Sequence, residues 1–338
     1  MTIKGPGGWS MLLSIVVVNW NTRDLLIKFL ISINEELKGS AFEWEIIVVD
    51  NASTDGSPDV VSKISPEVKV IVNHSNFGYA KALNIGVRET SGEFLCIANS
   101  DTEVLDNSIQ KLLSYILRNQ EVGLVAPMLI SPNGSIESNC KSFPNLFYTF
   151  SQALFLHQIF PHLKSFHREI TKFLPKSTPS FVDEVAGTFF ILRRKAFEDC
   201  DGFDEDFYFY GEDSDFSFRL CQKGWKIVYY PGAKVIHIGG ASAAQAWERS
   251  YMEAEKAKLL FWIKHKRRVE VILFIFVRIL SHLLRFLFKA FRYISVRDRR
   301  SPLHGKIILN LKALRFYLYS LLTAPFGNMK TIIKGEKI

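Results

Sequence analysis

Three carboxylates within four residues, Glu212, Asp213 and Asp215, are the strongest candidates for chemistry in this sequence. The aromatic residues 207–210 precede them, and an apolar spacing typical of a helix follows. Acids suit the positive end of a helix, and a carboxylate walled by aromatic rings can have its pKa tuned for proton transfer. A capped, solvated helix start would use the same residue types, so the rest of the chain must decide between the two interpretations.

The elements that must position these acids alternate between strands and helices. Val- and Ile-rich runs predict buried strands at 13–19, 44–50, 69–73, 93–99 and 122–126, with helices near 23–35, after Ser57-Pro58, near 78–90 and near 107–119. This alternation predicts an α/β fold with a mainly parallel sheet covered by helices on both faces. Later strands are predicted at 182–194, 226–230 and 234–237, and residues 140–180 are interpreted as a partly helical insertion or a loop.

Four of the predicted strands end in polar residues. The segments that follow them are Asn19-Trp20-Asn21, 50–56, 73–76 and 99–101, each rich in Asn, Asp or Ser. In sheets of this kind ligands bind at the carboxyl ends of the strands. We therefore expect these side chains to form one shared site.

Charge is distributed unevenly along the 338 residues. Residues 1–247 carry 22 Lys and Arg against 28 Asp and Glu, a net charge of −6, whereas residues 248–338 carry 20 against 6, a net charge of +14. Such a split predicts a folded body with a basic appendage that meets an anionic partner. The four cysteines show no metal-binding spacing and no secretory signal is recognised, so a cytoplasmic setting with reduced thiols is expected.

Motifs spread over residues 12–240 together resemble family-2 glycosyltransferases. They are Val-Val-Val-Asn-Trp-Asn (16–21), Val-Val-Asp-Asn-Ala-Ser-Thr-Asp-Gly-Ser (48–57), Asn-Phe-Gly-Tyr-Ala-Lys-Ala-Leu-Asn-Ile-Gly (76–86), Ala-Asn-Ser-Asp (98–101), Ala-Gly-Thr-Phe-Phe-Ile-Leu-Arg-Arg (186–194), residues 202–215 and Pro-Gly-Ala-Lys-Val-Ile-His (231–237). The resemblance implies a GT-A fold over residues 1–240, with a nucleotide-sugar half at about 12–130 and an acceptor half at about 131–240. Within the family, the sequences of these motifs are most similar to those of rhamnosyltransferase-like enzymes of bacterial cell-surface polysaccharide assembly.

The resemblance also implies a nucleotide-diphosphate sugar donor, carried by dTDP or UDP, and residues that hold it. Asp50 resembles the residue that binds the nucleoside, and Asn51 could fix the turn that follows; an ordinary turn role for Asp50 is the alternative. The expected donor-binding residues are Asn19, Asp50, Asn51, Asn76, Gly78, Lys81, Asn84 and Gly187.

Asp101 resembles the family's metal ligand and His237 its late histidine, so Mg²⁺ or Mn²⁺ is expected on the diphosphate. The family's Asp-x-Asp is here Asn99-Ser100-Asp101, which lacks the first carboxylate. Asp213 is the expected general base, which would take a proton from the acceptor hydroxyl during an inverting in-line displacement. Glu212 could hold that role instead, and Asp215 is expected to pair with Arg219 along the helix.

The C-terminal region, 241–338, is predicted to form basic amphipathic helices. Arg278, His282, Arg285, Lys289 and Arg292 fall within an arc of about 80° on a helix that is otherwise mostly apolar. A basic stripe of this kind favours the membrane interface, and the uncharged run 271–277 is too short to span a bilayer. A helical hairpin packed on the body, or a homodimer contact, is the alternative.

The sequence thus predicts an inverting hexosyltransferase, peripheral on the cytoplasmic face of the plasma membrane. It would pass a sugar, with L-rhamnose as one candidate, to a saccharide or lipid-linked acceptor in cell-surface glycan synthesis, and no nucleic-acid partner is expected. Two other classes stay open: a sugar nucleotidyltransferase, which should carry a Gly-rich phosphate loop where Asn19-Trp20-Asn21 stands, and a non-catalytic membrane-bound scaffold of the same fold.

Overall fold

The computed structural model describes residues 12–239, 246–295 and 303–323, and it divides the chain into two compact units. The sheet unit comprises Met1–Phe143 and Glu169–Gln245, and the helical unit comprises Pro144–Arg168 and Ala246–Ile338. The segment 144–168 was expected to belong to the acceptor half of the body. The structure instead groups it with the C-terminal helices.

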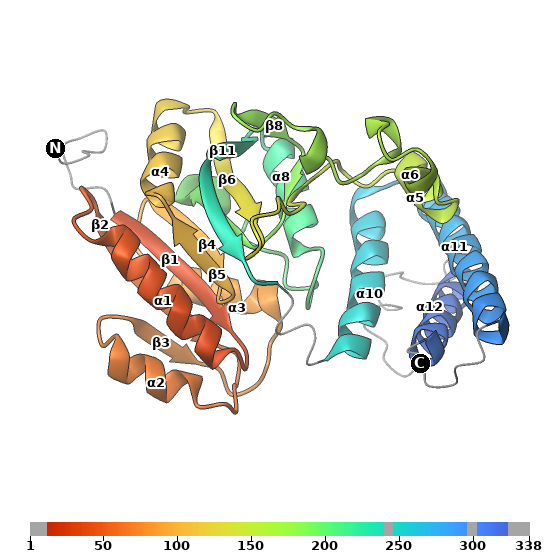
Figure 1. Cartoon of the computed structure of the whole chain (residues 1–338), viewed down its shortest axis with the longest axis horizontal. Helices are drawn as coiled ribbons and strands as arrows, with labels where there is room; N and C mark the ends of the chain where they lie inside the picture. Colours follow the sequence, from red (N-terminus) through yellow and green to blue (C-terminus); the bar gives the residue numbers. More distant parts are fainter. Residues whose placement is uncertain (1–11, 240–245, 296–302, 324–338) are drawn as a thin grey trace. The chain divides into compact units, whose positions relative to one another are not determined.

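The sheet unit is built on a mixed nine-stranded sheet with the order β3-β2-β1-β4-β10-β6-β11-β5, and β8 pairs with β11 (Figure 1). Its strands are β1 (Leu12–Asn19), β2 (Glu43–Asp50), β3 (Lys69–Val72), β4 (Phe94–Asn99), β5 (Thr102–Leu105), β6 (Val122–Ile130), β8 (Ser180–Val182), β10 (Phe189–Arg193) and β11 (Lys226–His237). A separate pair joins β7 (Cys140–Lys141) to β9 (Glu184–Val185). The helices are α1 (Arg23–Leu37), α2 (Ser57–Ile64), α3 (Tyr79–Arg88), α4 (Ser108–Arg118), α7 (Arg194–Asp199), α8 (Glu212–Gln222) and the short 3₁₀ helix η2 (Thr171–Phe173).

Helices cover both faces of this sheet, as the alternating side chains of β1 show. Leu13, Ile15 and Val17 belong to a core with the buried residues of α1 and α4, whereas Val16 packs with those of α3 and α8. All four side chains are fully buried. A strand that is apolar on both faces needs such a covering, so the predicted α/β layering is confirmed.

The strand order departs from the expectation in its second half. β1 to β4 form the predicted parallel set, but β10 lies antiparallel between β4 and β6. The predicted strand 182–194 is three short strands, and the two predicted at 226–230 and 234–237 are one strand with an irregularity between Tyr230 and Lys234. Burial by distant segments decides these features, which local periodicity does not record.

The helical unit is the second compact unit of the chain. It contains α5 (Leu146–Ala153), α6 (Leu156–Ile159), the 3₁₀ helix η1 (Lys164–Phe166), α10 (Trp247–His265), α11 (Arg268–Ser295) and α12 (Leu303–Thr323). α11 packs along α12, α10 and α5. Among the described residues, one helix, Arg268–Phe291 of α11, is long and apolar enough to cross a membrane by length and composition.

The aromatic segment 207–210 closes onto the start of α3 through Gly78. The Tyr79 amide donates to the Tyr208 carbonyl at 2.8 Å, and Gly78 has a φ of +85°. A Cβ at Gly78 would lie 2.3 Å from the Tyr208 carbonyl oxygen. Only glycine fits this contact, because both the conformation and the space exclude a side chain.

We predict that Gly78→Ala lowers the free energy of unfolding by more than Gly134→Ala. Gly134 also has a positive φ, +83°, but a Cβ there meets nothing within 4 Å. The control should therefore cost about 1 kcal/mol for the conformation alone, and Gly78→Ala should add about 1–3 kcal/mol for the clash. Urea unfolding of both variants measures the difference, and equal losses would contradict the Gly78–Tyr208 contact.

Candidate functional site

The polar strand ends meet at one edge of the sheet, as predicted. In the parallel ladder Asn19 is the partner of Asp50, and Val18 is the partner of Asn99. Asp50 pairs in turn with Val72, so Asn73 follows at the same level. The carboxyl ends of four strands therefore present Asn and Asp side chains side by side.

Asp50 is fully buried and shapes the turn after β2. Its Oδ1 accepts from Asn19 Nδ2 at 2.8 Å and its Oδ2 from the Ser53 amide at 2.8 Å. Thr22 Oγ1 donates to Asn19 Oδ1 at 2.7 Å, which holds the asparagine in this orientation. The turn role of Asp50, the local alternative in the sequence, is thus present, and each oxygen keeps a second lone pair for a ligand.

Asn51 fixes the neighbouring turn, as expected. Its Nδ2 donates to the Gly78 carbonyl at 3.1 Å, and its Oδ1 accepts from Asn73 Nδ2 at 2.9 Å. Asn76 accepts from the Gly78 amide at 3.0 Å. The close backbone approach that glycine permits here is made to Tyr208 of the same chain, a different partner from the donor expected from the sequence.

Lys81 and Asn84 have contacts with the segment 203–205 of the same chain. Asn84 is buried, donates to the Phe203 carbonyl at 2.8 Å and accepts from the Phe203 amide at 3.0 Å. Lys81 lies 3.9 Å from a carboxylate oxygen of Glu205 and over the Phe77 ring. Their positions on α3 fasten this helix to the segment 203–205, and the expected donor contacts of Lys81 and Asn84 stay a prediction.

Tyr79 stands at the centre of the site and was not singled out from the sequence. Its hydroxyl lies 2.6 Å from Asn99 Oδ1 and 2.9 Å from the Gly187 carbonyl oxygen. Burial raises the pKa of this phenol well above its usual range, and the carboxylates of Glu212, Asp101 and Asp213 raise it further. The sequence signal that could have indicated Tyr79 is its place directly after Gly78 in the 76–86 motif. Asn99, which replaces the first acid of Asp-x-Asp, is thus an acceptor for Tyr79.

Glu212 and Asp213, the two candidates for the general base at the start of α8, lie in different environments. Glu212 is 6% exposed, and its Oε2 has no hydrogen-bond partner among the described residues. Burial, followed by the charge of Asp213, raises the pKa of Glu212 to about 8. Asp213 is partly exposed, and its Oδ1 accepts from the Ser214 amide at 2.8 Å. Glu212 is therefore neutral at pH 7 and a poor proton acceptor, whereas Asp213 can reach solvent or substrate.

Gly187 and Asp215 support these acids in different ways. A Cβ at Gly187 would lie 3.7 Å from the Asp213 Cβ and 3.9 Å from Glu212 Oε1, so this backbone directly faces both acids. Asp215 is buried and accepts from Arg219 Nε at 2.7 Å, the pair expected along the helix. Arg219 also donates to the carbonyls of Cys200 and Gly202, which anchors the start of α8.

The structure brings Asp101 and His237 together. His237 Nε2 lies 3.6 Å from Asp101 Oδ1, and its Nδ1 lies 2.7 Å from Glu137 Oε2. Burial raises the pKa of Asp101, an effect that His237 partly offsets. A carboxylate on Nδ1 orients an imidazole so that Nε2 faces a metal, and Glu137, missed in the sequence, fills that supporting position.

These two side chains fit a divalent cation that a diphosphate also binds. Two donors each about 2.1 Å from one ion are separated by about 3.0–4.2 Å, depending on the angle at the metal. The 3.6 Å between Asp101 Oδ1 and His237 Nε2 lies in that range. Within the described residues no group of three or more His, Cys, Asp or Glu could hold a metal. Further oxygen ligands would have to come from substrate and water.

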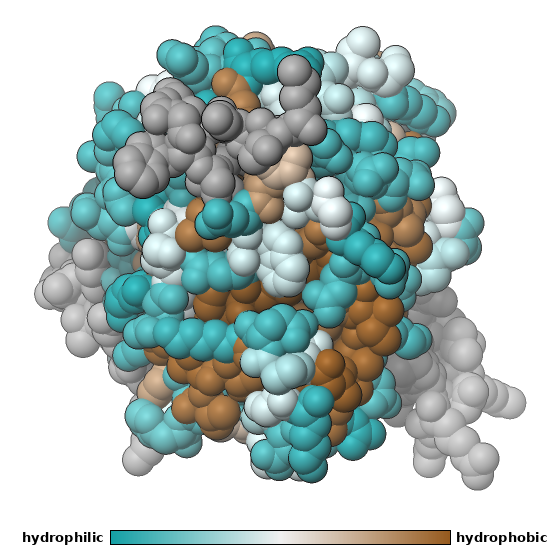
Figure 2. Space-filling view, turned by 90° about the vertical axis from the view of Figure 1, so that its left-hand side faces the viewer, coloured by the Kyte–Doolittle hydropathy of each residue, from teal (hydrophilic) through white to brown (hydrophobic). Residues whose placement is uncertain are grey.

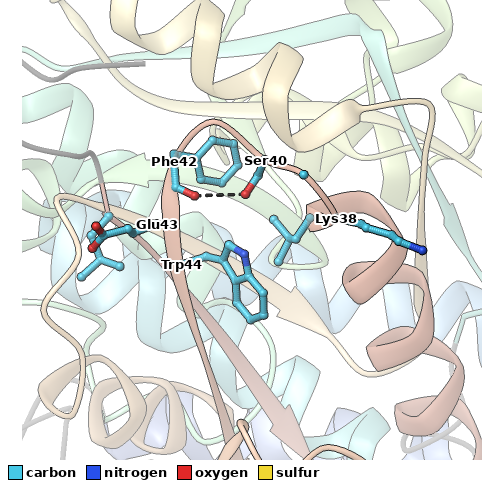
Figure 3. A pocket seen from close by; sticks show the side chains of 8 residues that line it. Lys38, Ser40, Phe42, Glu43 and Trp44 are labelled. Carbon is cyan, nitrogen blue, oxygen red and sulfur yellow. Dashed lines mark hydrogen bonds between the residues drawn. The ribbon is translucent and has the colours of Figure 1, made fainter. Parts of the chain in front are cut away.

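A separate pocket lies at the opposite edge of the sheet. It is lined by residues at the amino ends of β1 and β2 and the end of α1, among them Lys38, Ser40, Phe42, Glu43 and Trp44 (Figure 3). Ser40 Oγ donates to the Phe42 carbonyl at 3.0 Å across its rim. A strand of eight residues is about 25 Å long, so this pocket is remote from Asn19 and Asp50.

Fold and site together are those of the transferases with a GT-A-like sheet. The sequence profile "Glycosyl transferase family 2" matches residues 14–201, more than half of the chain, and "N-terminal domain of galactosyltransferase" matches 164–240. The chain belongs to glycosyl transferase family 2 and is a glycosyltransferase. The fold class and the family resemblance predicted from the sequence are confirmed.

Two curated relatives and one solved structure show what the chain is similar to. An "N-acetylglucosaminyl-diphospho-decaprenol L-rhamnosyltransferase" of Mycobacterium tuberculosis is 28% identical over 239 residues, which is 67% of this chain and 75% of the relative. The Escherichia coli "UDP-Glc:alpha-D-GlcNAc-diphosphoundecaprenol beta-1,3-glucosyltransferase WfgD" is 28% identical over 37% of this chain and 49% of its own length. A mannosyltransferase from Pyrobaculum calidifontis in complex with GDP-Man and Mn²⁺ matches with a TM-score of 0.50 at 17% identity, over 97% of this chain and 79% of that one, which supports the fold.

We predict that Glu212→Gln removes a pH-dependent destabilisation of the fold. The folded chain holds the Glu212 proton up to a pH of about 8, whereas the unfolded chain releases it near 4.5. The stability of the wild type should therefore fall as the pH rises through this window, because the folded state binds the extra proton.

Denaturant unfolding at pH 5 and pH 8.5 measures this effect. Relative to Glu212→Gln, the wild type should lose more than about 1 kcal/mol between the two values. Equal losses in both proteins would show that Glu212 ionises normally.

Proposed function

We propose that this glycosyltransferase transfers L-rhamnose from a dTDP-linked donor to a lipid-linked saccharide in cell-surface glycan synthesis, with inversion at the anomeric carbon. The observation that carries the reaction is the pair at the start of α8, a neutral buried Glu212 beside a partly exposed Asp213, facing Gly187 and Tyr79. The choice of sugar and acceptor is supported by the rhamnosyltransferase from M. tuberculosis, whose name specifies both. A UDP-sugar is the competing donor.

In this proposal the strand ends hold the donor. Asp50 accepts hydrogen bonds from the nucleoside with the lone pairs that its contacts with Asn19 and the Ser53 amide leave over. Asn19, whose amide group donates to both Asp50 and Ser53, holds this carboxylate in place and supplies backbone around the base. The backbone at Asn76 and Gly78 lies beside them through Asn51. Gly187 leaves space for the sugar next to Asp213, because no side chain stands there.

Asp213 acts as the general base. It takes the proton from the acceptor hydroxyl as that oxygen forms its bond to the anomeric carbon, and the bond to the diphosphate oxygen breaks on the opposite face. Glu212, neutral at pH 7, is already protonated and therefore does not take this proton. Asp215 and Arg219 hold both acids at the helix start.

Asp101 and His237 would hold Mg²⁺ or Mn²⁺, with Glu137 orienting the imidazole. Bound there, the ion neutralises charge that develops on the leaving diphosphate. Asp101 is 8% exposed and lies within a polar edge, so a cation would also relieve the cost of keeping its carboxylate ionised.

The proposed lipid-linked acceptor implies that the reaction occurs at a membrane. A lipid-linked saccharide presents its sugar at the bilayer surface, and nucleotide sugars are made in the cytoplasm, so we propose peripheral association with the cytoplasmic face of the plasma membrane. The net charge of +14 in residues 248–338 favours an anionic surface.

We predict that Asp213→Asn reduces sugar transfer by about 10²–10⁴-fold while donor affinity is kept. The amide is nearly isosteric with the carboxylate but cannot accept the acceptor proton. Transfer of radiolabelled rhamnose from the dTDP-linked donor to a GlcNAc-diphospholipid gives the rate, and calorimetry gives donor affinity.

Glu212→Gln is the matched control, because it should retain most of the activity at pH 7. Turnover of Asp213→Asn within tenfold of the wild type would exclude Asp213 as the base. If wild-type protein uses only UDP-sugars in the same assay, the rhamnose assignment fails and the transferase assignment remains.

A second prediction concerns the cation. Asp101→Ala should abolish the increase in donor affinity that Mn²⁺ gives the wild type, because it removes the only carboxylate of the 99–101 turn. Titration of the donor with and without Mn²⁺ measures this effect.

Glu137→Gln tests the residue that orients His237 and leaves the expected ligands, Asp101 and His237, intact. This variant should bind Mn²⁺ about 10- to 100-fold more weakly, since such partners orient the ligand without binding the ion. A wild-type donor affinity that is the same with and without Mn²⁺ would refute a metal role at this site.

A further inference from the structure

Over residues 269–291, helix α11 of the helical unit keeps its charged residues buried or partly buried and exposes apolar residues only. From Val269 to Phe291 every residue in the exposed class is apolar. These residues are Val269, Leu273, Phe276, Leu280, Leu283, Leu287, Phe288 and Phe291, with exposed fractions of 38–71%. The charged residues of the same stretch are buried or partly buried.

Seven of these apolar residues form one stripe, which we call the apolar stripe: Val269, Leu273, Phe276, Leu280, Leu283, Leu287 and Phe291. At 100° per residue they fall within an arc of about 80°, and the arc lies roughly opposite the basic residues 278–289. The stripe extends over 22 residue steps, or about 33 Å. A soluble helix has the reverse arrangement, with its apolar stripe toward the core.

The inward face explains why the basic stripe predicted from the sequence does not lie on the surface. Arg278 is 3% exposed and His282 is 0% exposed, and both contact Glu255 of α10. Burial alone would raise the pKa of Glu255, but Arg278 and Lys258 hold it well below its usual range. Tyr317 of α12 donates to the same carboxylate at 3.0 Å. The expectation that Arg278 and His282 face lipid headgroups was wrong, because a buried acid on another helix binds them; the side chain of Arg292 lies outside the described residues.

We propose that the apolar stripe of α11 is the surface by which the chain inserts into the bilayer, a step that rests on the proposed function because its acceptor is lipid-linked. Charges that face the bundle interior and apolar side chains that face outward are the arrangement that lipid favours. Contiguous exposed apolar surface of this length is rare on soluble monomers.

The net charge of the C-terminal region favours a bilayer, and not a second copy of the chain, as the partner of the apolar stripe. Two copies that met through this stripe would bring together two regions, residues 248–338 of each copy, that each carry a net charge of +14 and therefore repel. An anionic bilayer attracts the same charges and accepts the apolar stripe.

The neighbouring helix α12 indicates that the stripe lies in the interface and does not cross the membrane. Its exposed face mixes Leu311 and Leu318 with the exposed cations Lys312 and Arg315. Since α11 packs along α12, a crossing α11 would carry these cations into the hydrocarbon, where they are costly. At the interface long cationic side chains reach the headgroups.

Flotation of the full-length protein with phosphatidylglycerol vesicles tests the proposal. The variant Leu273→Gln, Leu280→Gln and Leu287→Gln should lose at least about tenfold in vesicle partitioning, because apolar burial supplies most interfacial affinity. The matched control changes Ile31, Ile64 and Val72 of the sheet unit to Gln; these are 49–61% exposed. Figure 2 shows one face of the molecule, on which hydrophobic patches lie among hydrophilic residues. Because apolar side chains are exposed in the sheet unit as well, the control variant should bind like the wild type.

Sedimentation in the absence of lipid separates the outcomes. A wild type that does not float, or a stripe variant that floats unchanged, overturns the proposal, and a lipid-free dimer that the stripe variant converts to monomer assigns the stripe to self-association instead. If the triple variant does not fold, an environment-sensitive fluorophore on Leu280→Cys decides: it should shift to shorter wavelength with vesicles, and no shift overturns the proposal. Transfer to a soluble, lipid-free acceptor is measured in parallel, and its loss would count against the proposed function only.

Discussion

The site depends on one constraint, the in-register parallel pairing of β1 with β2 and β4. This register brings Asn19 opposite Asp50, where their side chains bond at 2.8 Å, and sets Asn99 at the same edge. A slip of one residue would turn every core side chain of these strands to the other face. The buried Val and Ile residues thus fix the positions of the polar residues at the strand ends. The geometry of the site therefore depends on the packing of the core.

Much of the site could be predicted because its residues follow strongly patterned strands. The roles within the site were harder to predict, since they depend on what lies behind each side chain. Glu212 and Asp213 are adjacent acids in the sequence, yet one is buried without a partner for Oε2 and the other reaches solvent. Asn84 lies in a family-like motif, but its amide bonds the backbone of Phe203, 119 residues away. Partners at such separations leave no local pattern.

The C-terminal region shows the same limit for a helix. The periodicity of residues 278–289 correctly indicated an amphipathic helix, but a helical wheel shows two opposite faces and does not say which is inside. That choice is made by Glu255, a single acid on α10 that binds Arg278 and contacts His282. A buried ion pair of this kind is costly to break, because either charge alone would be left without compensation. The helical unit therefore buries these polar contacts among its apolar core residues and still leaves apolar surface outside.

The place of β10 in the sheet has a consequence for synthesis of the chain. β10 pairs with both β4 and β6, and it is made about 60–90 residues after them. A nascent chain on the ribosome can complete β1 to β4 early, but the edge of β4 then stays unpaired until residues 189–193 have emerged from the exit tunnel. Open strand edges are templates for wrong pairing, and pairing between distant segments is slow. The interval between these two strands is thus the period in which this protein depends most on protection by chaperones.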